Sequence, residues 1–214
     1  MTQEPVSLDL LDRTAVRRRA RWVALIAAVI GLVLGGVAAV FSIPLGIAVL
    51  IVLVAPVLLT AFGESRRSTS LQGTRIVVRG LVSREVDLAT AGGLDVLVSS
   101  MRGVRTVSLL AQPAKGGRAV SAALAMYKPM GQQGVGAREL GIVELRRLAD
   151  ALASTGDSQA LVLSELIVAQ LKAEARGDGA EARPLYRVGE LAKRNQVAEK
   201  LNSDSVTAFV ADLG

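Results

Sequence analysis

The sequence contains no histidine and no cysteine, and only 3% of its 214 residues are aromatic. A chain without these residues cannot form a thiolate nucleophile, a disulfide, a zinc finger, an iron–sulfur cluster or a histidine-ligated haem. A Ser-His-Asp triad is excluded too, so that serine chemistry would need a lysine as its base. The composition therefore argues against an enzyme and predicts no cofactor and no metal site.

Charged residues are absent from residues 22–63, although they make up 21% of the whole chain. As one helix this apolar run would be about 63 Å long, twice the roughly 30 Å hydrocarbon core of a bilayer. Pro44 cannot continue a helix, and it disfavours helical geometry at Ile43. We therefore expect two transmembrane helices, at about 22–40 and 45–62, rather than a signal peptide or a buried pair of soluble helices.

Arginines flank both outer ends of this hairpin, whereas the turn between the spans contains no lysine or arginine. Because basic residues stay on the cytoplasmic side, we expect both termini in the cytoplasm and the protein in the plasma membrane. Each such charge near an anionic leaflet contributes about 1 kcal/mol of attraction, so the arginines are also candidates for lipid contact. Arg75, Arg79 and Arg84 extend this basic region. The candidates for lipid contact are Arg17, Arg18, Arg19, Arg21, Arg66 and Arg67.

Gly31, Gly35 and Gly36 lie in the first span, the first two with small-xxx-small spacing. Glycine lets helix backbones approach closely, which favours packing between helices in lipid. The three glycines could dock a transmembrane helix of a partner subunit, or they could pack against the second span of the same chain. Neither span contains an ionisable residue, so we expect no ion pathway through the hairpin.

Beyond residue 70 the pattern changes to short apolar-alternating segments separated by glycines. Such segments predict an antiparallel sheet or a small barrel. Val120, Ala122, Leu124 and Met126 are expected on the inward face of the last one. The predicted strands are 74–79, 81–88, 94–98, 104–110 and 119–127.

The remaining third of the chain has helical periodicity. A loop at 128–136 is followed by a predicted helix from about 137 to 153. A second helix should begin after Asp157, a residue type that caps helices well, and run to about 176. The sequence predicts a third helix at 186–201 and a short final helix at 204–214.

Two spans, the segment TRIVVRGLVSREVDLA at 74–89 and the helix LRRLADAL at 145–152 resemble bacterial membrane proteins that carry a pleckstrin-homology-like domain. The resemblance covers about residues 22–154, although that family is richer in aromatic residues. It implies a membrane α-helical hairpin plus an α+β cytoplasmic domain, with a small curved antiparallel sheet and C-terminal helices. The expected parts are a basic tail at 1–21, the hairpin at 22–63, the β domain with its closing helix at 69–154 and a helical extension at 155–214.

No phosphate-binding motif is present, because the glycines at 131, 134 and 136 follow no strand-then-helix pattern. Arginine far outnumbers lysine, and Ala, Val and Gly abound, which indicates a GC-rich genome such as those of actinobacteria. Size, topology and composition resemble an accessory subunit of the actinobacterial respiratory cytochrome bcc–cytochrome oxidase supercomplex. This resemblance implies a non-catalytic scaffold whose partners are other integral membrane subunits. The alternative is a membrane-surface module for anionic lipid headgroups or a peptide. We expect neither a small-molecule substrate nor nucleic acid, since aromatic residues for stacking are scarce.

Overall fold

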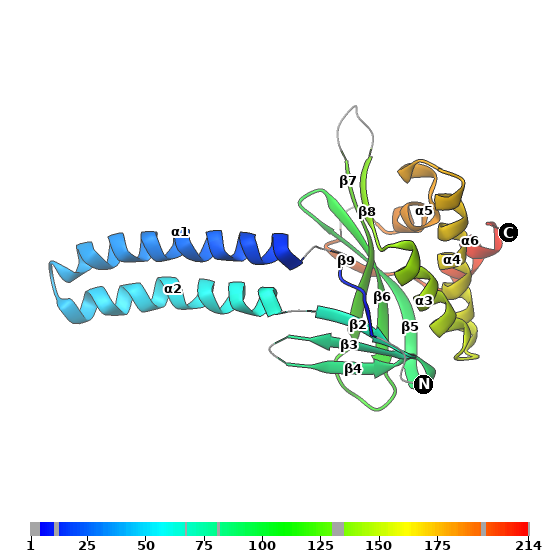
Figure 1. Ribbon diagram of the computed structural model, residues 1–214, viewed down its shortest axis with the longest axis horizontal. Coiled ribbons are helices and arrows are strands. Elements are labelled where there is room, and N and C mark those ends of the chain that lie inside the picture. Colours follow the sequence, from blue (N-terminus) through cyan, green and yellow to red (C-terminus); the bar gives the residue numbers. More distant parts are fainter. Residues whose placement is uncertain are drawn as a thin grey trace. The chain divides into compact units, whose positions relative to one another are not determined.

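The computed structural model describes residues 5–10, 13–66, 68–80, 82–129, 135–193 and 196–213 (Figure 1). The chain divides into two compact units. The hairpin unit comprises Leu11–Arg67 and Arg79–Ser83. The sheet unit comprises Met1–Leu10, Ser68–Val78 and Arg84–Gly214.

Two long helices, α1 (Arg13–Ala39) and α2 (Ile43–Arg66), lie side by side in the hairpin unit (Figure 1). The helix break at Pro44 is confirmed, since α2 begins one residue before this proline. α1 begins earlier than the predicted span because the basic segment ahead of Trp22 is also helical, and arginine is a good helix former. Within α2, the Thr60 hydroxyl donates to the carbonyl oxygens of Pro56 and Val57, at 3.0 and 2.9 Å.

The first sheet of the other unit has the strand order β1-β2-β3-β4, and neighbouring strands in this order are hydrogen-bonded. It pairs β1 (Val6–Ser7) with β2 (Ser68–Gln72), and β3 (Arg75–Arg79) with β4 (Arg84–Asp87). The strands β3 and β4 were predicted, but β1 and β2 were not. The two missed strands are short and polar, so they carry no clear apolar alternation, and they become strands by pairing with each other.

The second sheet has the order β8-β7-β6-β5-β9, and its strands pair in antiparallel fashion. Three of its strands were predicted, and they extend further than expected. Two edge strands were not: residues 135–139 were assigned to a loop and a helix start, and 198–200 to a helix. The five strands are β5 (Ala91–Met101), β6 (Val104–Pro113), β7 (Val120–Pro129), β8 (Val135–Glu139) and β9 (Ala198–Lys200).

The prediction of which β7 side chains face inward is partly wrong, and a β-bulge is the reason. Val120, Ala122 and Leu124 are buried as predicted, but Met126 is not, and Tyr127 is buried in its place. The register with β6 shifts between Val107 and Ser108, so Leu124 is an extra residue on β7. An extra residue reverses the side-chain alternation that follows it.

The C-terminal helices gather on one side of the strands (Figure 1). The predicted helix at 137–153 begins later, at Ile142, because the preceding residues pair with β7. The predicted N-cap is confirmed: the Asp157 side chain accepts a 3.0 Å bond from the Ala160 backbone amide. The third predicted helix is much shorter than expected. The helices are α3 (Ile142–Ala153), α4 (Ser158–Ala175), α5 (Pro184–Glu190) and α6 (Ser203–Ala211), with the single 3-10 turns η1 (Leu88–Thr90) and η3 (Ala180–Ala182).

A continuous hydrophobic core joins both sheets to these helices. It contains Leu8 beside β1, Leu71 of β2, Leu109 of β6, Leu145 of α3 and Leu166 of α4. The coarse prediction is therefore confirmed: two apolar helices accompany a domain of antiparallel sheet and C-terminal helices. The strands form two sheets instead of one, and the sheets are not closed.

Candidate interaction surfaces

The two apolar helices of the hairpin unit are long and apolar enough to span a bilayer. The candidate spans are Ala20–Ala39 and Ile43–Thr60, with mean hydropathies of 2.5 and 2.7. Only 11% and 6% of the residues in these windows are buried within the chain. The core helices of a soluble protein would be mostly buried, so these two helices present their apolar side chains to an environment outside the chain.

Two of the three glycines predicted for helix packing lie between α1 and α2. A Cβ added at Gly35 would lie 3.0 Å from the carbonyl oxygen of Gly46 and 3.3 Å from Leu50 Cβ. At Gly31, an added Cβ would overlap Val54 Cγ2. Gly46 reciprocates, because its own Cβ would lie 2.6 Å from the Gly35 carbonyl oxygen. The glycines therefore bring the two helix backbones of the same hairpin together.

For Gly31 and Gly35, this placement favours packing against the second span of the same chain over docking of a partner helix. The groove at Gly31 and Gly35 is already filled by α2. A Cβ at Gly36 would meet no described atom within 4 Å, and this residue is exposed. Only Gly36 therefore remains on the outer surface of the hairpin. Around it, the outer surface of α1 consists of large exposed side chains such as Leu32, Val33 and Val37.

The predicted lipid-contacting arginines lie at the ends of the hairpin. Arg18 and Arg21 belong to the N-terminal turns of α1, and both are exposed. Trp22, next to Arg21, is exposed as well, and tryptophan is the residue type that concentrates at membrane–water interfaces. The side chains of Arg17, Arg19 and Arg66, and all of Arg67, lie outside the described structure. The prediction of lipid contact therefore stays a prediction for all six.

Arg75 forms an ion pair within the first sheet. Its Nε lies 3.3 Å from Asp87 Oδ2, on the strand opposite. The Thr74 hydroxyl donates to Asp87 Oδ1 at 2.8 Å, and the Ala89 amide donates to the same oxygen at 3.1 Å. The hydrogen bond from Thr74, helped by Ala89 and Arg75, holds the pKa of Asp87 below its usual value against the opposing effect of burial. Arg75 thus has a structural partner within the first sheet.

A buried polar network joins β7, β8 and the segment before α5. The Tyr127 hydroxyl donates to Glu139 Oε1 at 2.7 Å, and Arg183 forms an ion pair with Glu139 Oε2. Burial, reinforced by Glu139, raises the pKa of Tyr127. Tyr186 packs edge-on against Tyr127, with ring centroids 5.2 Å apart. Because each polar group is paired, the network has a structural role: it links β7, β8 and the segment before α5. The sequence did not predict it because the pairing of β7 with β8 was not predicted.

A second buried polar network links β9 to the rest of the second sheet. Asp95 of β5 is buried, and its Oδ2 atom lies 2.8 Å from Lys200 Nζ and 3.2 Å from Gln112 Nε2. Lys200 belongs to β9, which pairs with the middle of β5. A buried carboxylate requires such partners, because an unpaired charge in the interior costs several kcal/mol.

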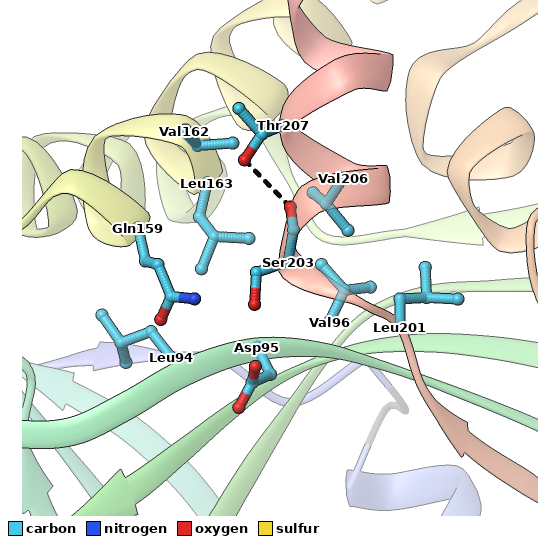
Figure 2. A pocket seen from close by; sticks show the side chains of 10 residues that line it. All are labelled: Leu94, Asp95, Val96, Gln159, Val162, Leu163, Leu201, Ser203, Val206 and Thr207. Carbon is cyan, nitrogen blue, oxygen red and sulfur yellow. Dashed lines mark hydrogen bonds between the residues drawn. The ribbon is translucent and has the colours of Figure 1, made fainter.

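A small cavity lies between β5, α4 and the start of α6 (Figure 2). Its volume is about 20 Å³, which is room for about one water molecule. Gln159 and Ser203 face each other across it, whereas the Thr207 hydroxyl is already used by the Ser203 carbonyl oxygen at 2.9 Å. Sites for organic ligands typically enclose about 300–1,000 Å³, so this cavity is no cofactor pocket.

A wider groove of about 380 Å³ runs between α4 and the C-terminal helix. Its lining combines apolar side chains with the charged Glu165, Lys172 and Arg176. Arg176 already pairs with Asp178 at 2.8 Å. The groove holds no nucleophile with an adjacent base. The residues that line it are Glu165, Val168, Ala169, Lys172, Arg176, Pro184, Val210 and Leu213.

No three acidic residues converge on a possible metal position within the described part of the chain. Gln170 is fully buried, and its Oε1 accepts the Leu185 backbone amide at 3.0 Å, which ties α4 to α5. Its Nε2 atom and Glu174 Oε2 are buried without a described hydrogen-bond partner. These two atoms lie on adjacent turns of one helix, and nothing around them forms a catalytic arrangement.

Comparisons of the chain with protein-family models, with curated proteins and with solved structures give no match. The family resemblance therefore rests on the sequence pattern alone.

Proposed function

We propose that this protein is a non-catalytic accessory subunit of a larger integral membrane complex. The observation that supports this most directly is the outer surface of the hairpin unit. Its two apolar helices bury small residues against each other and leave large aliphatic side chains outward. Such a surface fits lipid tails or the helices of other membrane subunits, and the sheet unit supplies a folded domain next to it in the chain.

The arrangement of the strands supports a membrane orientation as well. The strand β1 precedes the hairpin in the sequence and β2 follows it, yet the two strands pair. Both ends of the hairpin must therefore return to the same folded unit, as two crossings of a bilayer require. With the arginines at these ends, we place that unit and both termini in the cytoplasm, on the inner face of the plasma membrane.

The finer identification extends the same proposal. The antiparallel strands followed by α3 are compatible with a pleckstrin-homology-like domain. We propose the actinobacterial respiratory cytochrome bcc–cytochrome oxidase supercomplex as the parent complex, on the strength of the resemblance in size, topology and composition. In that role the chain would hold no haem or metal of its own.

Photocrosslinking in native membranes tests the subunit role. A photoreactive amino acid at Val52, which is exposed on α2, should capture a discrete membrane protein in stoichiometric yield. The matched control is Val54, two residues along, whose side chain faces Gly31 of the same hairpin. It should crosslink only within the chain.

Mass spectrometry of the captured partner then identifies the complex. A cytochrome subunit would support the respiratory assignment, and a different membrane protein would reject that assignment while retaining the subunit role. Crosslinks from Val52 to lipid alone, with no protein partner, would overturn the accessory-subunit proposal.

A further inference from the structure

We propose that the turn between β3 and β4 is a second membrane contact, in which Val82 enters the headgroup region of an anionic leaflet and Arg79 pairs with lipid phosphates. This inference deepens the proposed function, and it rests on the hairpin lying in a bilayer. It does not depend on which complex the protein joins.

The turn presents an apolar side chain where water-soluble turns present a polar one. Val82 is 68% exposed, and Ser83 beside it is exposed as well. β-turns favour Gly, Asn, Asp, Ser and Pro because these residues suit the backbone and remain solvated. A valine that is 68% exposed gains little packing within the described chain. Its side chain would be stabilised by transfer from water into any apolar phase that reaches the turn.

The position of the turn points to the bilayer. The segment Arg79–Ser83 groups with Leu11–Arg67 in the hairpin unit, apart from the rest of its own sheet. That unit contains the two candidate spans. Arg18 and Arg21, the exposed basic residues that lead into the first span, belong to the same unit. β2 begins two residues after α2 ends, and β3 is its hydrogen-bonded neighbour, so the turn after β3 belongs to the strands that directly follow the hairpin in the chain.

The charge of the turn suits an anionic surface. Arg79 is exposed, and among the described residues no carboxylate lies within ion-pair distance of it. Arg75, four residues earlier on the same strand, differs because Asp87 already neutralises it. Guanidinium groups bind phosphate through several donors at once, so Arg79 can hold the turn at the phosphates while Val82 enters the headgroup region.

Site-directed spin labelling of the full chain in nanodiscs tests the proposal, and the absence of native cysteine makes each label unique. The label is placed at Val82→Cys, at Val143→Cys as a control, and at Val33→Cys inside the first span. Val143 is a matched control because it is an exposed valine too, at 63%, but lies on α3 of the sheet unit. Accessibility to dissolved oxygen is compared with accessibility to a water-soluble nickel complex, in discs of phosphatidylglycerol and of phosphatidylcholine.

We expect the label at Val82 to be at least threefold less accessible to the nickel complex than the label at Val143 in phosphatidylglycerol discs. Arg79→Glu should abolish this protection, whereas Arg146→Glu on α3 should leave it unchanged. Circular dichroism of each variant checks that the fold is retained.

Each contrary result has its own meaning. A label at Val33 that is open to the nickel complex means that the hairpin is not inserted, and the proposed function fails with the inference. A protected Val33 with a Val82 label as open as the Val143 label overturns the membrane-contacting turn alone. Equal protection of Val82 in both lipids, unchanged by Arg79→Glu, would overturn the role of Arg79 and of anionic phosphate.

Discussion

Val6 and Leu71 lie opposite each other on the antiparallel strands β1 and β2, although both apolar helices separate them in the sequence. Leu8, just beyond β1, continues this contact: its amide donates to the Thr69 carbonyl oxygen at 2.8 Å. The Thr69 amide in turn donates to Asp9 Oδ1 at 2.7 Å. The segment before the hairpin is thus a structural part of the sheet unit.

The first prediction concerns this N-terminal contact. Leu8→Ala removes a side chain that is 1% exposed, so it should lower the free energy of unfolding of the sheet unit by about 2–5 kcal/mol. Urea unfolding of the full chain in detergent, followed by near-ultraviolet fluorescence and circular dichroism, measures the change. Val143→Ala, at an exposed position, should change it by less than about 0.5 kcal/mol. Equal effects of the two substitutions would contradict the packing of Leu8.

The second prediction compares two adjacent glycines. Gly35→Leu should destabilise the hairpin by about 1–3 kcal/mol or more, because its side chain would meet the backbone of Gly46. Gly36→Leu should be tolerated, since an added Cβ there meets no described atom within 4 Å. Thermal unfolding in detergent and resistance to proteolysis in membranes measure the difference. Should both leucine variants behave alike, the helices do not pack through Gly35.

The third prediction is a dependence of stability on alkaline pH. Burial and Glu139 raise the pKa of Tyr127, whereas an unfolded tyrosine has its ordinary pKa near 10. The unfolded chain therefore releases this proton first, so the contribution of Tyr127 is complete below about pH 10 and is lost as the pH rises further.

Tyr127→Phe provides the test of this dependence. At neutral pH the variant should lose about 1 kcal/mol, because Glu139 no longer receives the hydroxyl bond. Between about pH 9 and 11 its stability should fall less steeply than that of the original chain. A shallower slope remains in the variant from Tyr186, whose pKa is also raised by burial and by Glu190. Parallel curves for the two proteins would show that Tyr127 ionises as easily folded as unfolded.

The fourth prediction is that the two termini lie on the same side of the membrane, in the cytoplasm. The pairing of β1 with β2 brings both ends of the hairpin to one sheet, and the flanking arginines favour the inner face. Fusions of a cytoplasm-active fluorescent protein and of a periplasm-active phosphatase to Met1 and to Gly214 measure the side. Phosphatase activity from either fusion would contradict the two-span arrangement.

How far the sequence predicts the fold depends on how local each signal is. The charge-free run and Pro44 are sufficient for the two apolar helices, because helix hydrogen bonds are local and side-chain polarity sets the environment. Asp157 predicts the start of α4 for the same reason. By contrast, β8 and β9 carry no alternating pattern, and they form only because β7 and β5 offer unpaired edges.

The sequence by itself therefore determined the apolar hairpin, the absence of histidine and cysteine chemistry, and the presence of strands followed by helices. The tertiary structure decided what long-range contacts control. It turned Gly31 and Gly35 inward against α2, brought Val6 to Leu71, buried Tyr127 through a bulge at Leu124 and grouped the turn of Val82 with the hairpin. These outcomes depend on which residues, distant in sequence, come to lie side by side, and neither composition nor periodicity records that.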